Sequence, residues 1–291
     1  MSAETLVWIT PTLGAMVTWG LAQGLVKRYI GEVPPARFCL FYAFANAAVS
    51  LAFWAYHDTP PVLAPENRRF ASLGLLAYTL DGLGWILYYQ SIVHGPISIV
   101  GTLSAAYPAL TVVFARLFLD EMLQTTQYVG VAAVIVGCLG LAYTPPEART
   151  RRTQRRWMAY AGAAVLIWGV AATLMRYAYR LPGAHEASMA LFLAVGGLAT
   201  LGVYGLAFGR RGARQEWARA LGPMATMAVG SLLAAIAYKK GPASVVTPLS
   251  GAYPVVTLGF AWALLGERPS PVQWAGIVLV LAGMVLTTAT G

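Results

Sequence analysis

Two stretches of this chain have nearly the same sequence: GPISIVGTLSAAYP at residues 95–108 and GPASVVTPLSGAYP at residues 241–254. Nine of the fourteen positions are identical, and each pair is separated by 146 residues. Four later residues repeat at the same offset, because Glu121, Gln127, Gly130 and Gly137 return as Glu267, Gln273, Gly276 and Gly283. A general apolar bias cannot keep Pro, Tyr, Glu and Gln in register over this length. The chain is therefore a duplicated unit.

The composition indicates a membrane protein. Of the 291 residues, 58% are hydrophobic and 11% are charged, whereas soluble domains carry about 25% charged residues. A transmembrane barrel is disfavoured because its strands alternate apolar and polar residues, and here the apolar runs are continuous. We expect an all-α polytopic membrane protein embedded in the lipid bilayer.

Apolar runs of helical length recur along the chain. We expect ten transmembrane helices, at residues 6–29, 37–56, 70–93, 96–119, 125–143, 158–179, 186–208, 220–238, 242–265 and 271–290. The basic loop at residues 144–156 divides them into two units of five, residues 1–146 and 147–291. Because five is odd, the second unit enters the membrane from the opposite face. Two inverted five-helix repeats follow, with the substrate expected near the axis that relates them.

The net charge of +9 arises mainly from Lys and Arg in the short loops. Such bases orient helices in the bilayer, so nucleic acid is not an expected partner. More of them follow the odd-numbered helices than the even-numbered ones, which predicts both termini outside the cytoplasm. The two cysteines lie in apolar runs and support neither a disulfide nor a metal site. We expect no metal, no cofactor and a functional monomer.

The repeated Tyr-Pro pairs lie in the middle of the fourth and ninth predicted helices. Pro108 and Pro254 each remove a backbone hydrogen bond, which predicts two kinks beside Tyr107 and Tyr253. The freed carbonyl groups need a partner in hydrocarbon. Two interpretations stay open: the kinks line a hydrated cavity, or they are buried and satisfied by Ser104 and Ser250.

The doubled pattern G-P-x-S-x-V…S-x-A-Y-P…E…Q…G…G resembles the EamA-type transporters of the drug/metabolite transporter superfamily. The resemblance covers nearly the whole chain. It implies export of small metabolites across the bacterial inner membrane, most often amino acids. Within the family, the chain resembles exporters of aromatic amino acids. Relatives in the superfamily carry sugars, sugar phosphates, nucleotide sugars, vitamins or drugs, which stay as alternatives.

Asp81 is the one acid well inside a predicted span, near the middle of the third helix. A charge there is costly and indicates function. It is a candidate proton carrier or a contact for a substrate ammonium group. The alternatives are a structural ion pair with Lys27, Arg176 or Lys239, or a protonated, hydrogen-bonded acid.

Aromatic residues surround this position. Tyr78, Trp85 and Tyr89 share the helical face of Asp81 because they lie three or four residues from it or from each other. Further aromatics well inside their spans are Trp19, Tyr107, Trp168 and Tyr253. Each ring is either packing or part of a pocket. Together with Asp81, Ser104 and Ser250 they predict a site for a substrate with a flat apolar body and a zwitterionic head, which favours neutral or aromatic amino acids.

Other repeated residues have simpler interpretations. Gly130 and Gly137, like Gly276 and Gly283, lie on one helical face and predict close helix packing. Glu121 and Glu267 are expected to cap the next helix or to pair with a base. Lys239 and Lys240 either bind a phosphate group or extend to the lipid headgroups.

The residues favour a secondary transporter that works by alternating access. No Walker A motif is present, so ATP-driven transport is not supported. An intramembrane enzyme is disfavoured because the three histidines lie on separate loops without HExxH or GxSxG. A passive channel is disfavoured because rings of like charge are missing. Coupling to protons stays open, and Asp81 is the candidate for it.

Overall fold

The computed structural model of the protein describes residues 3–29, 32–57, 61–62, 64–94, 100, 104, 106–142, 156–209, 214–266 and 268–288. These residues form helices and turns, and no strand occurs among them. Eight of the helices are long and apolar enough to cross a bilayer, and Tyr107–Phe118 and Thr125–Leu141 are shorter apolar helices.

The elements follow the predicted order. In the first half they are α1 (Ala3–Tyr29), α2 (Pro35–Tyr56), the short 3-10 helix η1 (Pro65–Asn67), α3 (Arg68–His94), α5 (Tyr107–Phe118) and α6 (Thr125–Ala142). In the second half they are α7 (Arg156–Tyr179), α8 (Glu186–Gly197), the π-helical turn η3 (Leu198–Gly202), α9 (Val203–Phe208), α10 (Arg214–Lys240), α11 (Ala243–Gly251), α12 (Pro254–Leu265) and α13 (Pro271–Thr288). Segments α8, η3 and α9 form one continuous helix, because no turn separates them.

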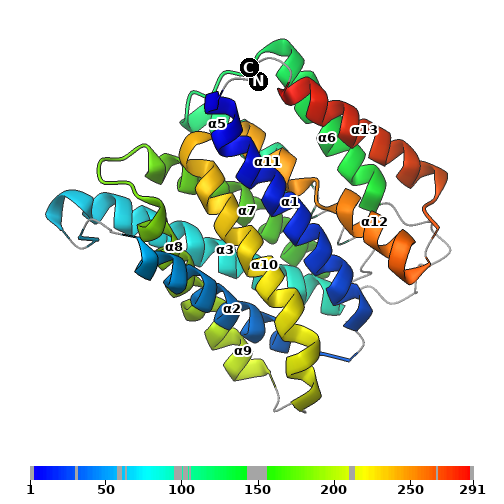
Figure 1. The fold of residues 1–291 in the computed structure, drawn as a ribbon, viewed down its shortest axis with the longest axis horizontal. Helices are drawn as coiled ribbons and strands as arrows, with labels where there is room; N and C mark the ends of the chain where they lie inside the picture. Colours follow the sequence, from blue (N-terminus) through cyan, green and yellow to red (C-terminus); the bar gives the residue numbers. More distant parts are fainter. Residues whose placement is uncertain are drawn as a thin grey trace.

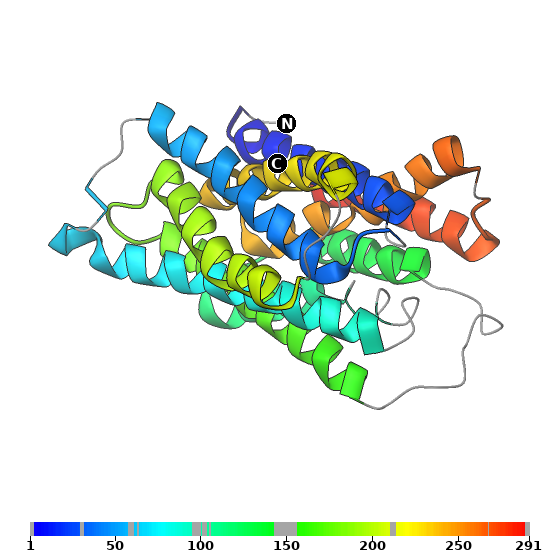
Figure 2. The same cartoon turned by 90° about the horizontal axis from the view of Figure 1, so that it is seen from below.

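The two halves are interleaved. Helix α1 packs along α10, and its counterpart α7 packs along α3, so the first helix of each half lies against the third helix of the other. Figures 1 and 2 both show α1, in dark blue, beside α10, in yellow. The fifth helices, α6 and α13, pair with each other at one edge of the bundle (Figure 1). Any cavity between the halves is therefore walled by both.

Equivalent helices run in opposite directions. Gly130 of α6 lies against Gly283 of α13, whereas Gly137 lies against Gly276. A Cβ atom at Gly137 would lie 2.8 Å from the Gly276 carbonyl oxygen, and one at Gly276 would lie 2.8 Å from that of Gly137. The glycines thus permit the close backbone approach expected of them. The antiparallel pairing of two equivalent helices is the arrangement expected of an inverted repeat.

The repeated glutamines begin these two helices. The Oε1 atom of Gln127 accepts the N–H of Gln124 at 3.0 Å, and that of Gln273 accepts the N–H of Ser270 at 2.8 Å. In both halves a side chain three residues into the helix reaches back to a free backbone donor, as in a capping box.

The ninth span is interrupted rather than kinked, which corrects the predicted continuous helix. Helix α11 ends at Gly251, a turn follows, and α12 begins at Pro254. The carbonyl that Pro254 leaves free belongs to Ser250, and it accepts the N–H of Tyr253 at 3.3 Å. The hydroxyl groups of Ser104 and Ser250 donate one turn earlier, to the Val100 and Val246 carbonyls at 2.8 Å. Each serine hydroxyl therefore donates to a carbonyl in the preceding turn, and not to the carbonyl that the following proline leaves without its helical donor.

Candidate functional site

A cavity of about 90 Å³ lies between the two halves. This volume holds several water molecules. The first half contributes side chains from α1, α2, α3 and α5, namely Trp19, Gln23, Tyr42, Tyr78, Asp81, Trp85 and Tyr107. The second half contributes Trp168, Ala172, Met175, Leu193, Met227, Ser231, Ala234, Ala235, Tyr238 and Tyr253. The lining is mainly aromatic and apolar, with few polar groups, as in sites for small molecules.

Most of the site residues predicted from the sequence meet at this cavity. Those that line it are Trp19, Tyr78, Asp81, Trp85, Tyr107, Trp168 and Tyr253. The other three, Tyr89, Ser104 and Ser250, do not line it. Tyr89 is buried and packs against Trp85 and Tyr88, and the two serines bond backbone carbonyls.

The backbone of Asp81 accepts a hydrogen bond, whereas its carboxylate has no partner among the described residues. Its carbonyl oxygen accepts the indole N–H of Trp168 at 3.3 Å. Within the described residues, the carboxylate makes no hydrogen bond and no ion pair. Two of the predicted partners are engaged elsewhere, since Arg176 pairs with Glu121 and Lys239 pairs with Glu186. The side chain of the third, Lys27, lies outside the described residues. Among the described residues that line the cavity there is one acid and no Lys or Arg.

Two tryptophans occupy equivalent places, one from each half. The indole of Trp168 lies against Gly84, and that of Trp19 lies against Gly230, which is the repeat equivalent of Gly84. Each also meets the tyrosine of a Tyr-Pro pair. The ring centroids of Trp168 and Tyr107 are 5.7 Å apart, and those of Trp19 and Tyr253 are 6.4 Å apart. The cavity wall therefore repeats the same aromatic pair about the axis.

The polar groups of the wall do not repeat. Asp81 stands where the second half has Met227, and Trp85 stands where it has Ser231, both at the offset of 146 residues. The acid and the additional ring belong to the first half, and the smaller or apolar residues belong to the second. The Trp–Tyr pairs of the wall are therefore repeated in the two halves, whereas the charged position, Asp81, is not.

Three buried tyrosine hydroxyls near the cavity differ in their partners. The Tyr42 hydroxyl bonds the Ser231 hydroxyl at 2.6 Å, and the Tyr238 hydroxyl bonds that of Thr247 at 2.8 Å. The Tyr78 hydroxyl is buried and has no partner within the described residues. A buried hydroxyl without a partner is costly, so Tyr78 offers a donor for a bound molecule.

Sequence reasoning missed Gln23, Tyr42, Ser231 and Tyr238. Two of them carried a signal: Gln23 lies one helical turn after Trp19 on the same face, and Ser231 is the repeat equivalent of Trp85. Tyr42 and Tyr238 carried none, because their helices are rich in apolar residues on every side.

Comparison with known proteins supports the duplication. The model of the EamA-like transporter family matches residues 6–143 and again residues 155–289. The crystal structure of another protein superposes with a TM-score of 0.76 at 19% identity, over 100% of this chain and 99% of that one. An uncharacterized protein of Methanocaldococcus jannaschii is 32% identical over 76 residues, which cover 26% of this chain and 56% of that protein.

The structural match at this identity speaks to the fold alone, and the archaeal relative is matched over about half of its length. The family model, by contrast, covers nearly all of both halves. The chain is a multi-pass membrane protein and belongs to the EamA-like transporter family.

Proposed function

We propose that this protein is a secondary transporter that exports amino acids or related small metabolites from the cytoplasm of a bacterium. It lies in the inner membrane as ten spans in two inverted five-helix repeats. It works as a monomer by alternating access, with the cavity between the repeats opening to one face at a time.

The cavity at Asp81 is the observation that carries this proposal. A carboxylate that has no partner among the described residues and lies among aromatic rings suits an ammonium group attached to a flat or apolar body. The Tyr78 hydroxyl is a donor that suits a carboxylate on the same molecule. The Trp19 indole N–H already donates to Ser231 Oγ at 3.3 Å. Neutral and aromatic amino acids combine these features.

Phosphorylated substrates are less well supported. A phosphate group calls for Arg or Lys, and neither occurs among the described residues of the cavity lining. Lys239, one of the two lysines considered as a phosphate site, forms an ion pair with Glu186. Arg176 forms an ion pair with Glu121. A substrate without phosphate from another class, such as a vitamin or a drug with an amine, remains the alternative.

Purified protein in liposomes loaded with labelled amino acids tests the proposal, with and without a pH gradient. We expect efflux of neutral or aromatic amino acids that competes with unlabelled substrate and is absent from protein-free liposomes. No flux of any amino acid would remove this substrate class. Efflux that a pH gradient accelerates would add protons as the coupling ion.

A further inference from the structure

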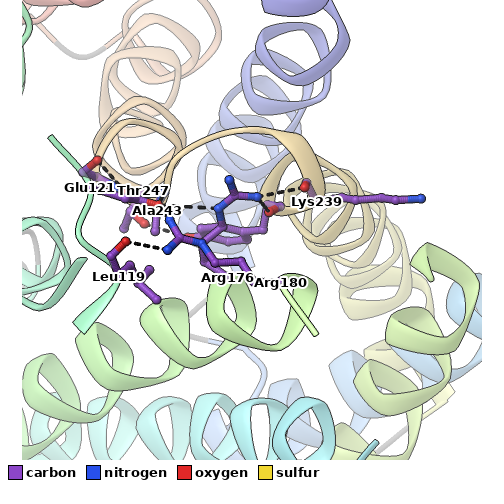
Figure 3. A network of polar contacts seen from close by, with 9 residues as sticks. Leu119, Glu121, Arg176, Arg180, Lys239, Ala243 and Thr247 are labelled. Carbon is purple, nitrogen blue, oxygen red and sulfur yellow. Dashed lines mark hydrogen bonds and ion pairs between the residues drawn. The ribbon is translucent and has the colours of Figure 1, made fainter. Parts of the chain in front are cut away.

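A network of charged groups lies at the end of the cavity where α7 and α10 end and α11 begins (Figure 3). It is centred on Glu121, which follows α5 in the first half and whose side chain is 5% exposed. The sequence predicted that Glu121 caps the next helix or pairs with a base. It does pair with bases, but the helix it caps is α11 of the other half. Its repeat equivalent, Glu267, lies outside the described residues.

The Glu121 carboxylate supplies the missing cap of α11. Pro242 precedes this helix and provides no side-chain cap. The backbone N–H groups of Ala243 and Ser244 donate to Glu121 at 3.0 and 2.9 Å, and the Ser244 hydroxyl donates at 2.7 Å. Free N–H groups at a helix start attract an anion, and such bonds to a charged acceptor are strong.

Two arginines of α7 connect the same carboxylate to the neighbouring segments. Arg176 Nε and Arg180 Nη2 each lie 3.5 Å from Glu121 Oε1. Arg176 also donates to the carbonyls of Tyr238 and Lys239, at 3.0 and 2.8 Å, and these residues end α10. Arg180 donates to the Leu119 carbonyl, just after α5. Glu121 and these two arginines thus connect the ends of α7 and α10, the start of α11 and the segment after α5 (Figure 3).

This network lies next to the cavity. Met175 precedes Arg176 and lines the cavity, and Tyr238, whose carbonyl Arg176 binds, lines it as well. In α11 beside this network, Ser244 is 1% exposed, and Thr247, whose hydroxyl bonds that of the cavity-lining Tyr238, is 0% exposed. A substrate that passes this end must separate α11 from α7 and α10, and that separation breaks the bonds to Glu121.

We propose that Glu121 is a latch that holds this end of the cavity closed, and that the cavity opens here when the carboxylate leaves the start of α11. The inference rests on the proposed transport function, because a latch has a role only if the cavity opens. A buried carboxylate that loses its partners must be hydrated or paired again. Opening at this end therefore admits water to Glu121, Arg176 and Arg180 together.

Accessibility of a single cysteine to a membrane-impermeant maleimide tests the latch without any substrate. The protein has two free cysteines, Cys39 and Cys138, both buried, and Cys39→Ala with Cys138→Ala removes them. Ala235→Cys then places one thiol at the cavity, where Ala235 is 2% exposed. Pro182→Cys, in the exposed turn after Arg180, identifies membrane vesicles in which this face is outward.

We expect the Ala235→Cys thiol to react slowly from this face, and Glu121→Gln to raise the rate about tenfold, since hydrogen bonds to a charged group contribute at least that factor. The matched control is Glu186→Gln, which removes the Lys239–Glu186 ion pair at the same end without contact to α11. Its labelling rate should equal that of the parent.

Ser244→Ala removes only the hydroxyl donor and should raise the rate in the same direction by a smaller factor, which keeps the test decisive if Glu121→Gln does not fold. Unchanged labelling in the folded variants, or an equal rise in Glu186→Gln, would overturn the latch. Because labelling needs no substrate, a failed amino-acid flux assay leaves this result standing, and a failed labelling assay leaves the flux result standing.

Discussion

The indole of Trp168 lies directly over Gly84, and its Nε1 donates to the carbonyl of Asp81 at 3.3 Å. A Cβ atom at Gly84 would stand 2.6 Å from that nitrogen. Because Gly84 has no side chain, α7, the first helix of the second half, can contact the backbone of Asp81 through Trp168. Trp19 packs against Gly230 in the same way on the other side of the axis, but its Nε1 donates to the Ser231 hydroxyl at 3.3 Å and not to a backbone carbonyl.

Gly84→Ala should displace the Trp168 indole and damage the cavity. An added methyl group in such a contact typically costs about 1–3 kcal/mol of folding free energy, whereas Ala in an open helix position gains up to about 1 kcal/mol over Gly. Thermal unfolding in detergent and substrate flux in liposomes measure the two effects. Gly222→Ala is the matched control, because nothing lies within 4 Å of a Cβ there. Equal behaviour of the two variants would refute the contact.

Asp81→Asn should weaken substrate binding through the ammonium group while leaving the fold intact. The carboxylate makes no bond to a described residue, so its loss removes no structural partner. A charge-assisted hydrogen bond to substrate contributes about 1.5–3 kcal/mol, which predicts a rise in the apparent Kd of about tenfold or more. Competition binding with labelled substrate measures it. Asp120→Asn, in the exposed turn after α5, is the control. Unaltered affinity across pH 6–8 would remove Asp81 from both substrate and proton binding.

The hydroxyl of Tyr78 should matter for substrate and not for stability. It is buried without a partner within the described part of the chain, so Tyr78→Phe relieves an unpaired donor and should leave the unfolding temperature the same or higher. Tyr238→Phe removes a hydroxyl that bonds Thr247 and should cost about 1 kcal/mol. Flux should fall in Tyr78→Phe in spite of its stability. A Tyr78→Phe variant with normal flux would assign this hydroxyl to packing alone.

Pro254→Ala should join α11 and α12 into one helix. The new N–H can bond the Ser250 carbonyl, which now accepts from Tyr253 at 3.3 Å. We expect the Tyr253 ring to move from its place 6.4 Å from Trp19, with flux reduced and folding stability kept. Quenching of Trp19 emission in a variant without the other tryptophans reports the movement. The comparison is Pro271→Ala at the start of α13, where the missing N–H costs little. Identical emission in both would show that the break does not depend on Pro254.

The repeat predicted the arrangement because duplication restricts it so strongly. An offset of 146 residues and an odd number of helices require equivalent helices to run in opposite directions, and Gly137 against Gly276 is the contact expected of them. Asp81 of the third helix was predicted because a charged residue inside a membrane span is rare. Its aromatic neighbours were predicted because residues three or four positions apart share one face of a helix. The spacing of Tyr78, Asp81 and Trp85 therefore predicted three side chains of the cavity wall.

Contacts between the halves could not be predicted in the same way. Sequence spacing places Tyr89 on the Asp81 face, but the packing of α2 against α3 covers it, and Tyr89 lies in the core with Phe38 and Phe41. Proline indicates a missing hydrogen bond, but whether a helix bends or breaks depends on its neighbours. The local sequence predicts that Glu121 caps the next helix or pairs with a base, and the pairing is confirmed. Nothing in that sequence points to α11, which begins 122 residues later at Ala243.

The unequal chemistry of Asp81 and Met227 has a consequence for direction. Two identical halves would give a carrier with no preference between its two faces. Among the described lining residues the one acid lies on α3, so in the proposed carrier an amine bound by Asp81 contacts the first half, whereas α10 offers no charged group to it. In the proposed carrier, loading and unloading then differ in rate between the two faces. The direction of net transport is still set by the substrate gradient and any coupled ion gradient, because an uncoupled carrier cannot shift an equilibrium.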